Sequence, residues 1–248
     1  MNASKAIRSL ISFLTTIPVG MPDDALDQTA TNMHLFPIVG AFIGLLTGIP
    51  AYLLFLAFPE DLAGILSYGL LQSITGLQHL DGLFDLGDGL MTHSTPKRKI
   101  EAMKDPNLGV GGISIGVFFS ALTVVLMSKL KIGILIPSLI VCEMISKLSM
   151  VLLAWLGKSA STGMATRFID EMQGKTRRFS FSLAFTLFTA WIVLGWKGIG
   201  SVAACIVGDL VLLEIARRNF EGLTGDVFGA SNEISRAIAL FLIVGVGN

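Results

Sequence analysis

The chain has 248 residues, of which 52% are hydrophobic and only 15% are charged. A soluble domain usually has about 25% charged residues, so much of this surface must contact something other than water. The 18 basic residues are balanced by 18 acidic ones, which excludes a strongly basic nucleic-acid-binding protein, and we expect no nucleic-acid partner. Cys142 and Cys205 lie in apolar segments, so neither a disulfide framework nor a cysteine zinc site is expected.

The N-terminal segment 3–18 predicts an amphipathic helix. Ile7, Leu10 and Leu14 would share one face of this helix, whereas Lys5 lies away from that face. The apolar stretch is too short and too often interrupted by polar residues for a secretory signal. We therefore expect this helix to lie in the membrane interface.

Several later segments are long and apolar enough to cross a membrane. A spanning helix needs about 20 mainly apolar residues, and we predict seven spans, at residues 35–58, 62–80, 110–128, 132–156, 180–196, 199–216 and 233–247. The second is expected to continue as a polar helix towards Met91. Gly40, Gly44 and Gly48 recur every four residues in the first span, which favours close helix packing. We expect a single all-α integral-membrane domain over residues 1–248, a polytopic bundle of about seven spans.

Basic residues are unevenly distributed among the predicted loops. Thirteen Lys and Arg residues precede the first span or lie in the even-numbered loops, and the opposite loops hold Lys129, Lys131 and Lys197. Cytoplasmic loops of membrane proteins carry an excess of Lys and Arg. We therefore expect the N-terminus and the even-numbered loops to face the cytoplasm, from an inner or cell membrane.

Three aspartates follow the second predicted span. Asp81, Asp85 and Asp88 are spaced i, i+4 and i+7, so a helix would place their carboxylates on one face. Such close like charges repel one another unless a cation neutralises them, and oxygen ligands suit Mg²⁺ or Mn²⁺. A solvated helix end is the alternative, but acids beside an apolar span are usually functional. His79 is either a catalytic residue or an ordinary hydrogen-bonded side chain.

The loop from Lys104 to Gly112, KDPNLGVGG, combines a cation with a glycine-rich helix start. Free N–H groups at a helix N-terminus favour phosphate binding, although the spacing is not that of a P-loop. A flexible turn between helices is the alternative interpretation. The predicted substrate-binding residues of this loop are Lys104, Asp105, Gly109, Gly111 and Gly112.

Two further groups of polar residues are candidates for the site. Asp226, after the sixth predicted span, is expected to be a general base or a further metal ligand, unless it is only a helix cap. Gly225 and Asn219 would contact substrate beside it. Inside the fourth span, Glu143 and Lys147 are spaced i, i+4 and can pair; they are predicted to contact substrate or to form a buried structural pair.

Together these segments resemble the cobalamin synthases (adenosylcobinamide-GDP ribazoletransferases). The resemblance rests on four blocks that follow one another in the expected order, residues 36–40, 79–89, 103–112 and 223–230. Members of that family often have an acidic residue where this chain has Leu80 and an arginine where it has Lys147, so family roles are not carried over to these two positions.

The resemblance implies a membrane transferase that joins α-ribazole, through its 5′-hydroxyl or its 5′-phosphate, to adenosylcobinamide-GDP and releases GMP. This would be the final step of cobalamin nucleotide-loop assembly. A metal ion on the three aspartates would bridge the pyrophosphate, and Lys104 would hold the guanylate together with the backbone of residues 109–112. Asp226 or His79 would accept the proton of the attacking hydroxyl. The expected partners are these two substrates and the lipid bilayer, and a homo-oligomer remains open.

Three other functions fit parts of the sequence. A CDP-alcohol phosphatidyltransferase also has aspartates at a membrane helix end, but its D-x-x-D-G-x-x-A-R pattern is absent, because Gly82 follows Asp81 directly. A transporter with an acidic ion site would have broken helices in mid-membrane, whereas these acids cluster at one face. A structural membrane subunit would need none of them.

Overall fold

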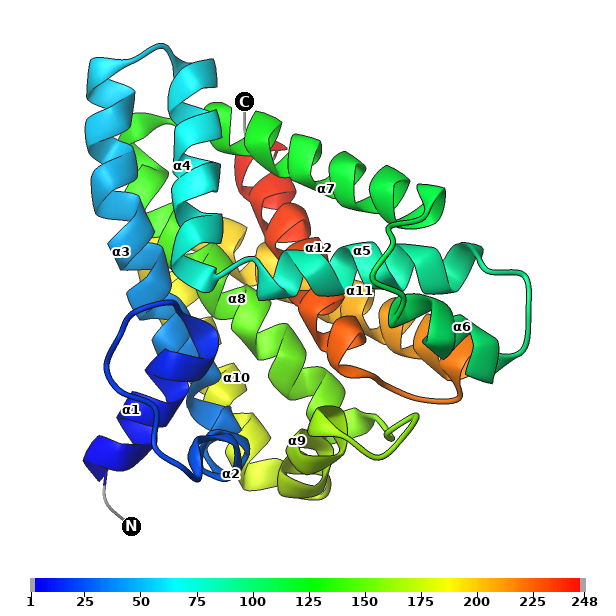
Figure 1. Cartoon of the computed structure of the whole chain (residues 1–248). Coiled ribbons are helices and arrows are strands. Elements are labelled where there is room, and N and C mark those ends of the chain that lie inside the picture. Colours follow the sequence, from blue (N-terminus) through cyan, green and yellow to red (C-terminus); the bar gives the residue numbers. More distant parts are fainter. Residues whose placement is uncertain (1–2, 246–248) are drawn as a thin grey trace.

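The structure is a computed structural model that describes residues 3–245, and every regular element in that range is helical (Figure 1). This confirms the all-α prediction. In chain order the helices are α1 (Ala3–Leu14), α2 (Ala25–Thr31), η1 (Met33–Leu35), α3 (Phe36–Ala57), α4 (Glu60–Thr75), α5 (Gln78–Met91), α6 (Pro96–Met103), α7 (Val110–Ser128), η2 (Ile132–Ile134), α8 (Leu135–Leu156), α9 (Met164–Met172), α10 (Thr176–Leu194), α11 (Trp196–Phe220) and α12 (Gly225–Gly245).

Within residues 3–245, six helices rather than seven are long and apolar enough to cross a membrane. They are α3 with η1, α7, α8 with η2, α10, α11 and α12. The predicted second span corresponds to α4, which has only 16 residues. Because a spanning helix needs about 20 residues, the expectation of seven spans is corrected to six candidates plus this shorter helix.

The predicted continuous helix from residue 62 to Met91 is also corrected, because the chain turns between α4 and α5. Gly76 and Leu77 both have left-handed backbones, with φ of 70° and 63°. Their N–H groups both donate to the carbonyl of Gln72, which is a common way for a helix to end at a glycine. α5 then starts in a new direction and crosses the bundle beneath α7 (Figure 1).

The central helix of the bundle is α8, which packs against α3, α10, α11 and α12. Every residue from Val141 to Ala154 is buried. α3 comes close to α8 at two of the predicted glycines: a Cβ atom at Gly40 would lie 2.4 Å from the carbonyl oxygen of Glu143, and one at Gly44 would lie 2.5 Å from that of Leu139. These helices can touch only because those positions lack side chains.

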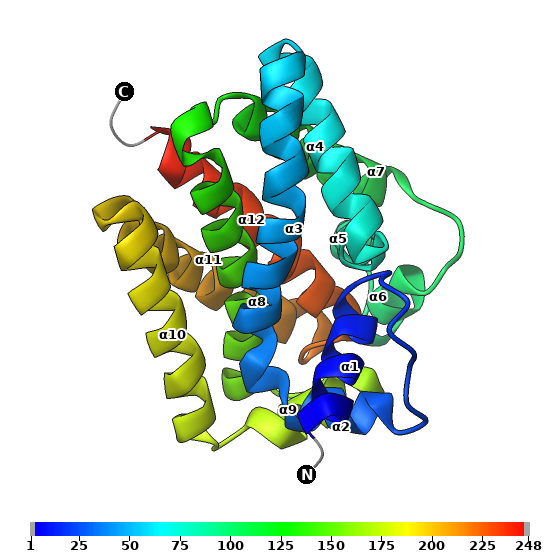
Figure 2. The ribbon, with the colours of Figure 1, turned by 90° about the vertical axis from the view of Figure 1, so that its left-hand side faces the viewer.

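The two ends of the bundle differ. At one end Lys129, Lys131 and Lys197 surround a small cavity together with residues 243–244. At the opposite end α1, α2 and α9 form a cap below α3 and α8 (Figure 2). Leu10 and Leu14 of α1 are buried in the core of the protein, whereas Ile7 is 54% exposed. The placement of α1 in the membrane interface stays a prediction.

Candidate functional site

A cleft of about 800 Å³ opens between α5, the loop after α6, the loop before α9 and the start of α12. We call it the acidic cleft. Six predicted site residues, from three distant parts of the sequence, line it: Asp81, Asp85, Lys104, Asp105, Gly225 and Asp226. The other lining residues are Leu77, Leu80, Phe84, Met103, Pro106, Leu108, Ser161, Thr162, Gly163, Met164, Ala165 and Thr224.

Close backbone contact between α5 and α12 brings the acids together. A Cβ atom at Gly82 would lie 2.8 Å from the carbonyl oxygen of Asp226, and one at Gly229 would lie 3.1 Å from that of His79. A larger residue at Gly82 would therefore push the two helices apart, whereas one at Gly229 would need only a small shift. Thr224 holds the start of α12, because its hydroxyl donates to Asp226 Oδ2 at 3.2 Å and accepts from the N–H of Val227 at 3.3 Å.

The acidic cleft has an excess of negative charge around Asp85. The pKa of Asp85 is raised to about 7, first by burial and then by the charges of Asp81, Asp226 and Asp88. A carboxyl group in such surroundings either keeps its proton or attracts a cation. Asp81, Asp85 and Asp226 are therefore the acids in this cleft that an incoming cation would stabilise.

Asp88 has a different environment from the other two acids of α5. Its Oδ2 accepts a hydrogen bond from the N–H of Gly109, and its Oδ1 accepts one from the N–H of Gly112, both at 2.8 Å. This carboxylate caps the N-terminus of α7, where the helix dipole favours negative charge. The predicted phosphate-binding N–H groups of these two glycines are thus already bonded inside the protein, and Gly111 packs against the carbonyl of Gly87.

The predicted metal site is not preassembled. Among residues 3–245, no three carboxylate, imidazole or thiol groups form a group ready to hold a metal ion. Mg²⁺, however, is usually held by one or two carboxylates together with water and substrate phosphates. Asp81 and Asp85 fit that manner of binding, because both line a cleft large enough for a phosphorylated substrate. The metal assignment stays a prediction, and Asp226, which was expected to be a general base or a further metal ligand, lines the same cleft.

Two other predicted site residues lie outside the acidic cleft. His79 is only 4% exposed, and its Nδ1 has no hydrogen-bond partner among the described residues. It lines a second, smaller cavity that also borders Asp226. Asn219 is at the end of α11, where its side-chain oxygen accepts a hydrogen bond of 2.6 Å from Lys99 Nζ.

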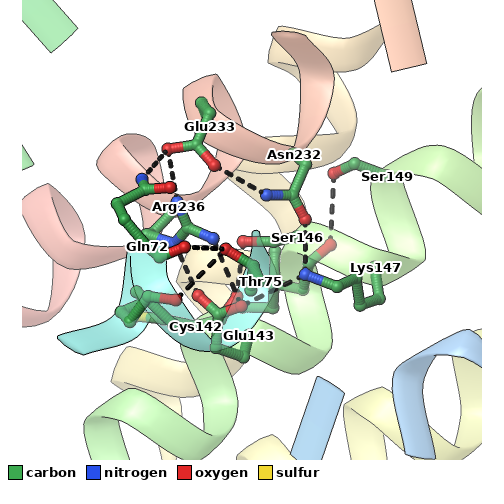
Figure 3. Close-up of polar contacts among 12 residues, drawn as sticks. Gln72, Thr75, Cys142, Glu143, Ser146, Lys147, Ser149, Asn232, Glu233 and Arg236 are labelled. Atoms are coloured by element: carbon green, nitrogen blue, oxygen red, sulfur yellow. Dashed lines mark hydrogen bonds and ion pairs between the residues drawn. The ribbon is translucent and has the colours of Figure 1, made fainter. Parts of the chain in front are cut away.

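Glu143 and Lys147 belong to a buried polar network between α8 and α12 (Figure 3). Lys147 Nζ lies 3.2 Å from Glu143 Oε2 and donates to Asn232 Oδ1 at 2.7 Å. Arg236 Nε donates to Glu143 Oε1 at 2.5 Å, and another nitrogen of the same guanidinium pairs with Glu233. The predicted i, i+4 pairing is therefore confirmed, and neither of its members lines the acidic cleft. Their contact with substrate stays a prediction.

This network, which we call the buried ion network, is balanced in charge. Two acids, Glu143 and Glu233, pair with two bases, Lys147 and Arg236, and each side chain is at most 3% exposed. Buried charges need such partners, because an unpaired one is costly in a low-dielectric interior. Glu233 and Arg236 were not among the residues predicted from the sequence, although their i, i+3 spacing inside an apolar segment is a signal for a buried pair.

Comparison with known proteins identifies the family of the chain. A family model described as cobalamin-5-phosphate synthase matches residues 6–244. The chain belongs to this family. The family resemblance expected from the aspartate and glycine blocks is thereby confirmed.

Several named proteins are similar in sequence to almost the whole chain. An adenosylcobinamide-GDP ribazoletransferase of Methanococcoides burtonii is 33% identical, over 96% of this chain and 91% of the relative. A protein of the same name from Methanosarcina mazei is 34% identical over the same shares, and one from Archaeoglobus fulgidus is 32% identical over 95% of each chain. No solved structure matches.

The loop before α9 forms a wall of the acidic cleft, although none of its residues was predicted from the sequence as part of the site. The N–H of Ala160 donates to the carbonyl of Leu223 at 3.0 Å, and the N–H of Leu223 donates to the carbonyl of Lys158 at 2.7 Å. These bonds tie the loop before α9 to the start of α12, and residues 161–163 line the acidic cleft together with Asp226. The signal was a run of small and polar residues, GKSASTG at 157–163, directly after an apolar span.

Proposed function

We propose that this protein is an adenosylcobinamide-GDP ribazoletransferase. It would join α-ribazole or α-ribazole 5′-phosphate to adenosylcobinamide-GDP and release GMP, which completes the nucleotide loop of cobalamin. One observation carries the proposal. The family match over residues 6–244 includes every residue that lines the acidic cleft, which has both acidic and basic side chains. Its relatives of 32–34% identity bear the name of this activity.

We propose a different attacking hydroxyl from the one expected from the sequence, and the description of the family supports this change. A product named cobalamin-5-phosphate carries its phosphate at the 5 position. An acceptor that keeps its 5′-phosphate cannot be joined through the 5′-oxygen. The attacking group in the proposed reaction is therefore another hydroxyl of the ribose and not the 5′-hydroxyl expected from the sequence.

In the proposed reaction, the ribose oxygen forms a bond to the phosphorus next to cobinamide. The bond between that phosphorus and the oxygen bridging to GMP breaks, and GMP leaves with the bond electrons. The hydroxyl proton passes to Asp226, a carboxylate in the wall of the acidic cleft that can act as a general base. Lys104, which also lines the acidic cleft, would bind the guanylate phosphate through a charge-assisted hydrogen bond.

Asp81 and Asp85 are the residues that would hold Mg²⁺ or Mn²⁺. Such a cation, when bound, neutralises charge on the pyrophosphate. Both carboxylates line the acidic cleft, where burial first and then the charges of Asp81, Asp226 and Asp88 raise the pKa of Asp85 to about 7. The third acid of the same helix face, Asp88, would act indirectly by fixing α7 against α5.

We also propose that the acidic cleft faces the cytoplasm. α6, which contains Lys97, Arg98 and Lys99, leads directly into the wall of the cleft at Lys104. The opposite end of the bundle has few basic residues. Since positive loops stay on the cytoplasmic side of a membrane, this asymmetry supports an orientation in which water-soluble substrates reach the site from the cytoplasm.

The break between α4 and α5 is a feature that a transporter would share. Here, however, Leu77 at the break lines the acidic cleft, four residues before Asp81. The break therefore turns α5, which carries the aspartates, towards the acidic cleft. An enzyme needs this placement as much as a transporter does, so the break does not favour a transport function over a transferase function.

The proposed function is tested by GMP release from purified protein in detergent or nanodiscs. Adenosylcobinamide-GDP with Mg²⁺ should give GMP only when α-ribazole or its 5′-phosphate is added. Asp226→Asn protein, prepared in the same way, serves as the control for contaminating activity. GMP release that does not depend on the acceptor, or no release under conditions in which the protein is folded, would contradict the proposal.

A further inference from the structure

A smaller cavity of about 160 Å³ adjoins the acidic cleft behind Asp226. We call it the aromatic cavity. The two spaces have four wall residues in common, Met164, Ala165, Gly225 and Asp226. A molecule bound in the cleft beside Asp226 is therefore next to the aromatic cavity.

The walls of the aromatic cavity are rich in aromatic and sulfur-containing side chains. Phe13, Phe168 and Phe228 line it from three different helices. The ring centroid of Phe168 lies 5.3 Å from that of Phe13 and 6.5 Å from that of Phe228. Met33 and Met150 complete the apolar wall. Aromatic rings bind another flat ring by offset stacking and edge-to-face contacts, and methionine adapts to its shape.

One residue of this wall, His79, has a ring nitrogen without a hydrogen-bond partner. His79 is 96% buried, and its Nδ1 makes no hydrogen bond to any residue of the described range 3–245. Buried polar atoms without a partner are rare in native proteins. Ligand pockets typically combine an apolar lining with a few polar groups that set the orientation of the ligand. The aromatic cavity has this combination.

We propose that the aromatic cavity binds the heteroaromatic base of the nucleoside acceptor, with the imidazole of His79 as the hydrogen-bonding group for a ring nitrogen. This inference rests on the proposed function, because it assigns a binding site to one of the two substrates. It gives His79 a role in binding and specificity, in place of the proton transfer considered from the sequence.

The size and position of the aromatic cavity fit this occupant. A cavity of roughly 150 Å³ holds a benzene-sized molecule, so about 160 Å³ accommodates a flat base and not a whole nucleoside. The ribose would then lie at the common wall, where Gly225 leaves room beside Asp226. This order places the attacking hydroxyl at Asp226 and the pyrophosphate beyond it, towards Asp81.

The test compares two phenylalanines of one aromatic cluster. Phe168 lines the aromatic cavity, whereas Phe36, whose ring centroid lies 6.0 Å from that of Phe168, is as deeply buried and does not line it. Phe168→Ala should raise the KM for α-ribazole at least tenfold and leave the KM for adenosylcobinamide-GDP within twofold. Phe36→Ala should leave both KM values within twofold.

A second experiment measures equilibrium binding and starts from the wild-type protein. Free benzimidazole should bind the wild-type protein at equilibrium and inhibit competitively against α-ribazole but not against adenosylcobinamide-GDP. Met150→Phe, which fills the cavity, should abolish this binding. His79→Asn, which can keep one hydrogen-bonding group, should retain more benzimidazole affinity than His79→Leu.

The outcomes separate this inference from the proposed function. Equal acceptor KM in the wild type and in Phe168→Ala, or an equal rise in Phe36→Ala, would overturn the base subsite while the transferase activity stands. Displacement of benzimidazole by phospholipid alone, with no competition from α-ribazole, would instead make the cavity an acyl-chain site. If the wild type releases no GMP, the transferase proposal fails, and the benzimidazole binding experiment still decides whether the cavity binds a base.

Discussion

Asp88 accepts a hydrogen bond of 2.8 Å from the backbone N–H of Gly112 at the start of α7. Its second carboxylate oxygen accepts another from Gly109 at the same distance. The carboxylate therefore joins α5 to α7, although the sequence places it on one helix face with Asp81 and Asp85. Two of the three acids line the acidic cleft and the third supports the helix beside it.

This division predicts different effects for the same substitution. Asp88→Asn keeps one acceptor oxygen but loses the charge at the N-terminus of α7, so the protein should lose about 1 kcal/mol of stability, as is usual for a damaged helix cap. Asp81→Asn should leave thermal stability unchanged or slightly raised, since it removes a like charge near Asp85, and should abolish turnover. Thermal unfolding in detergent and GMP release, measured on the same preparations, check both effects. Equal stability of the two variants would contradict the capping role.

The pKa of Asp85 predicts a dependence of stability on pH. Its folded-state pKa is about 7, against 3.8 for the ordinary carboxyl. Between these values the folded state binds more protons than the unfolded state, so the free energy of unfolding should fall as pH rises from about 4 to 7. Asp85→Asn should flatten this part of the curve of thermal midpoint against pH. If the thermal midpoints of the wild type and of Asp85→Asn change with the same slope between pH 4 and 7, Asp85 does not titrate in that window.

The same carboxyl group should make cation binding depend on pH. A proton on Asp85 competes with Mg²⁺, so the affinity for Mg²⁺ should weaken as pH falls below about 7. Stabilisation by Mg²⁺, followed as the shift in thermal midpoint, should therefore be larger at pH 8 than at pH 6. In Asp85→Asn the shift should be small at both pH values. An equal shift for wild type at the two pH values would argue against a cation at this acid.

Lys104 and Asp226 should affect different kinetic constants. Lys104→Ala removes a charge-assisted hydrogen bond to the substrate, which typically contributes about 1–3 kcal/mol, and should raise the KM for adenosylcobinamide-GDP with kcat little changed. Asp226→Asn removes the proton acceptor and should lower kcat and kcat/KM together. Steady-state kinetics with both substrates varied distinguish the two. The reverse pattern would mean that the two loops have been assigned the wrong way round.

The buried ion network predicts a large loss of stability from one substitution. Arg236→Met leaves Glu233 without its cation, and removing one member of a buried pair typically costs about 3–5 kcal/mol. The double variant Glu233→Met, Arg236→Met removes both charges and keeps the pair of Glu143 with Lys147. It should recover much of the lost thermal stability. No difference between the single and double variants would show that the charge balance of the network is unimportant.

How far the sequence alone could predict the structure depended on how local each interaction is. The i, i+4 pair of Glu143 and Lys147 was predictable because both residues are on one helix. Their partner Arg236 is 93 residues away from Glu143 in the sequence, and no helical spacing connects it to that pair. The spacing of the three aspartates correctly predicted that α5 presents them on one face. Which of these carboxylates accepts a hydrogen bond from the N–H of Gly109, and which is free to bind a cation, depends on tertiary packing.

The end of α4 had a local signal that hydropathy concealed. Gly76 terminates the helix in a left-handed conformation, yet Leu77 and Leu80 follow it and the residues before it are mainly apolar, so the segment 62–80 has the composition of one span. The acidic cleft was predicted in its parts, since Asp81, Lys104 and Asp226 were all selected. That they line one cleft depends on the close contact of α5 with α12. This contact joins two segments far apart in the sequence, so no local pattern predicts it.

The central claim is tested most directly by following one phosphorus atom. Adenosylcobinamide-GDP carrying labelled phosphorus next to cobinamide is incubated with the purified protein, Mg²⁺ and α-ribazole 5′-phosphate. If the ribose hydroxyl attacks that phosphorus, all of the label should appear in the corrinoid product and the released GMP should be unlabelled. Label in released GDP or inorganic phosphate, or a corrinoid product without label, would contradict the proposed transfer.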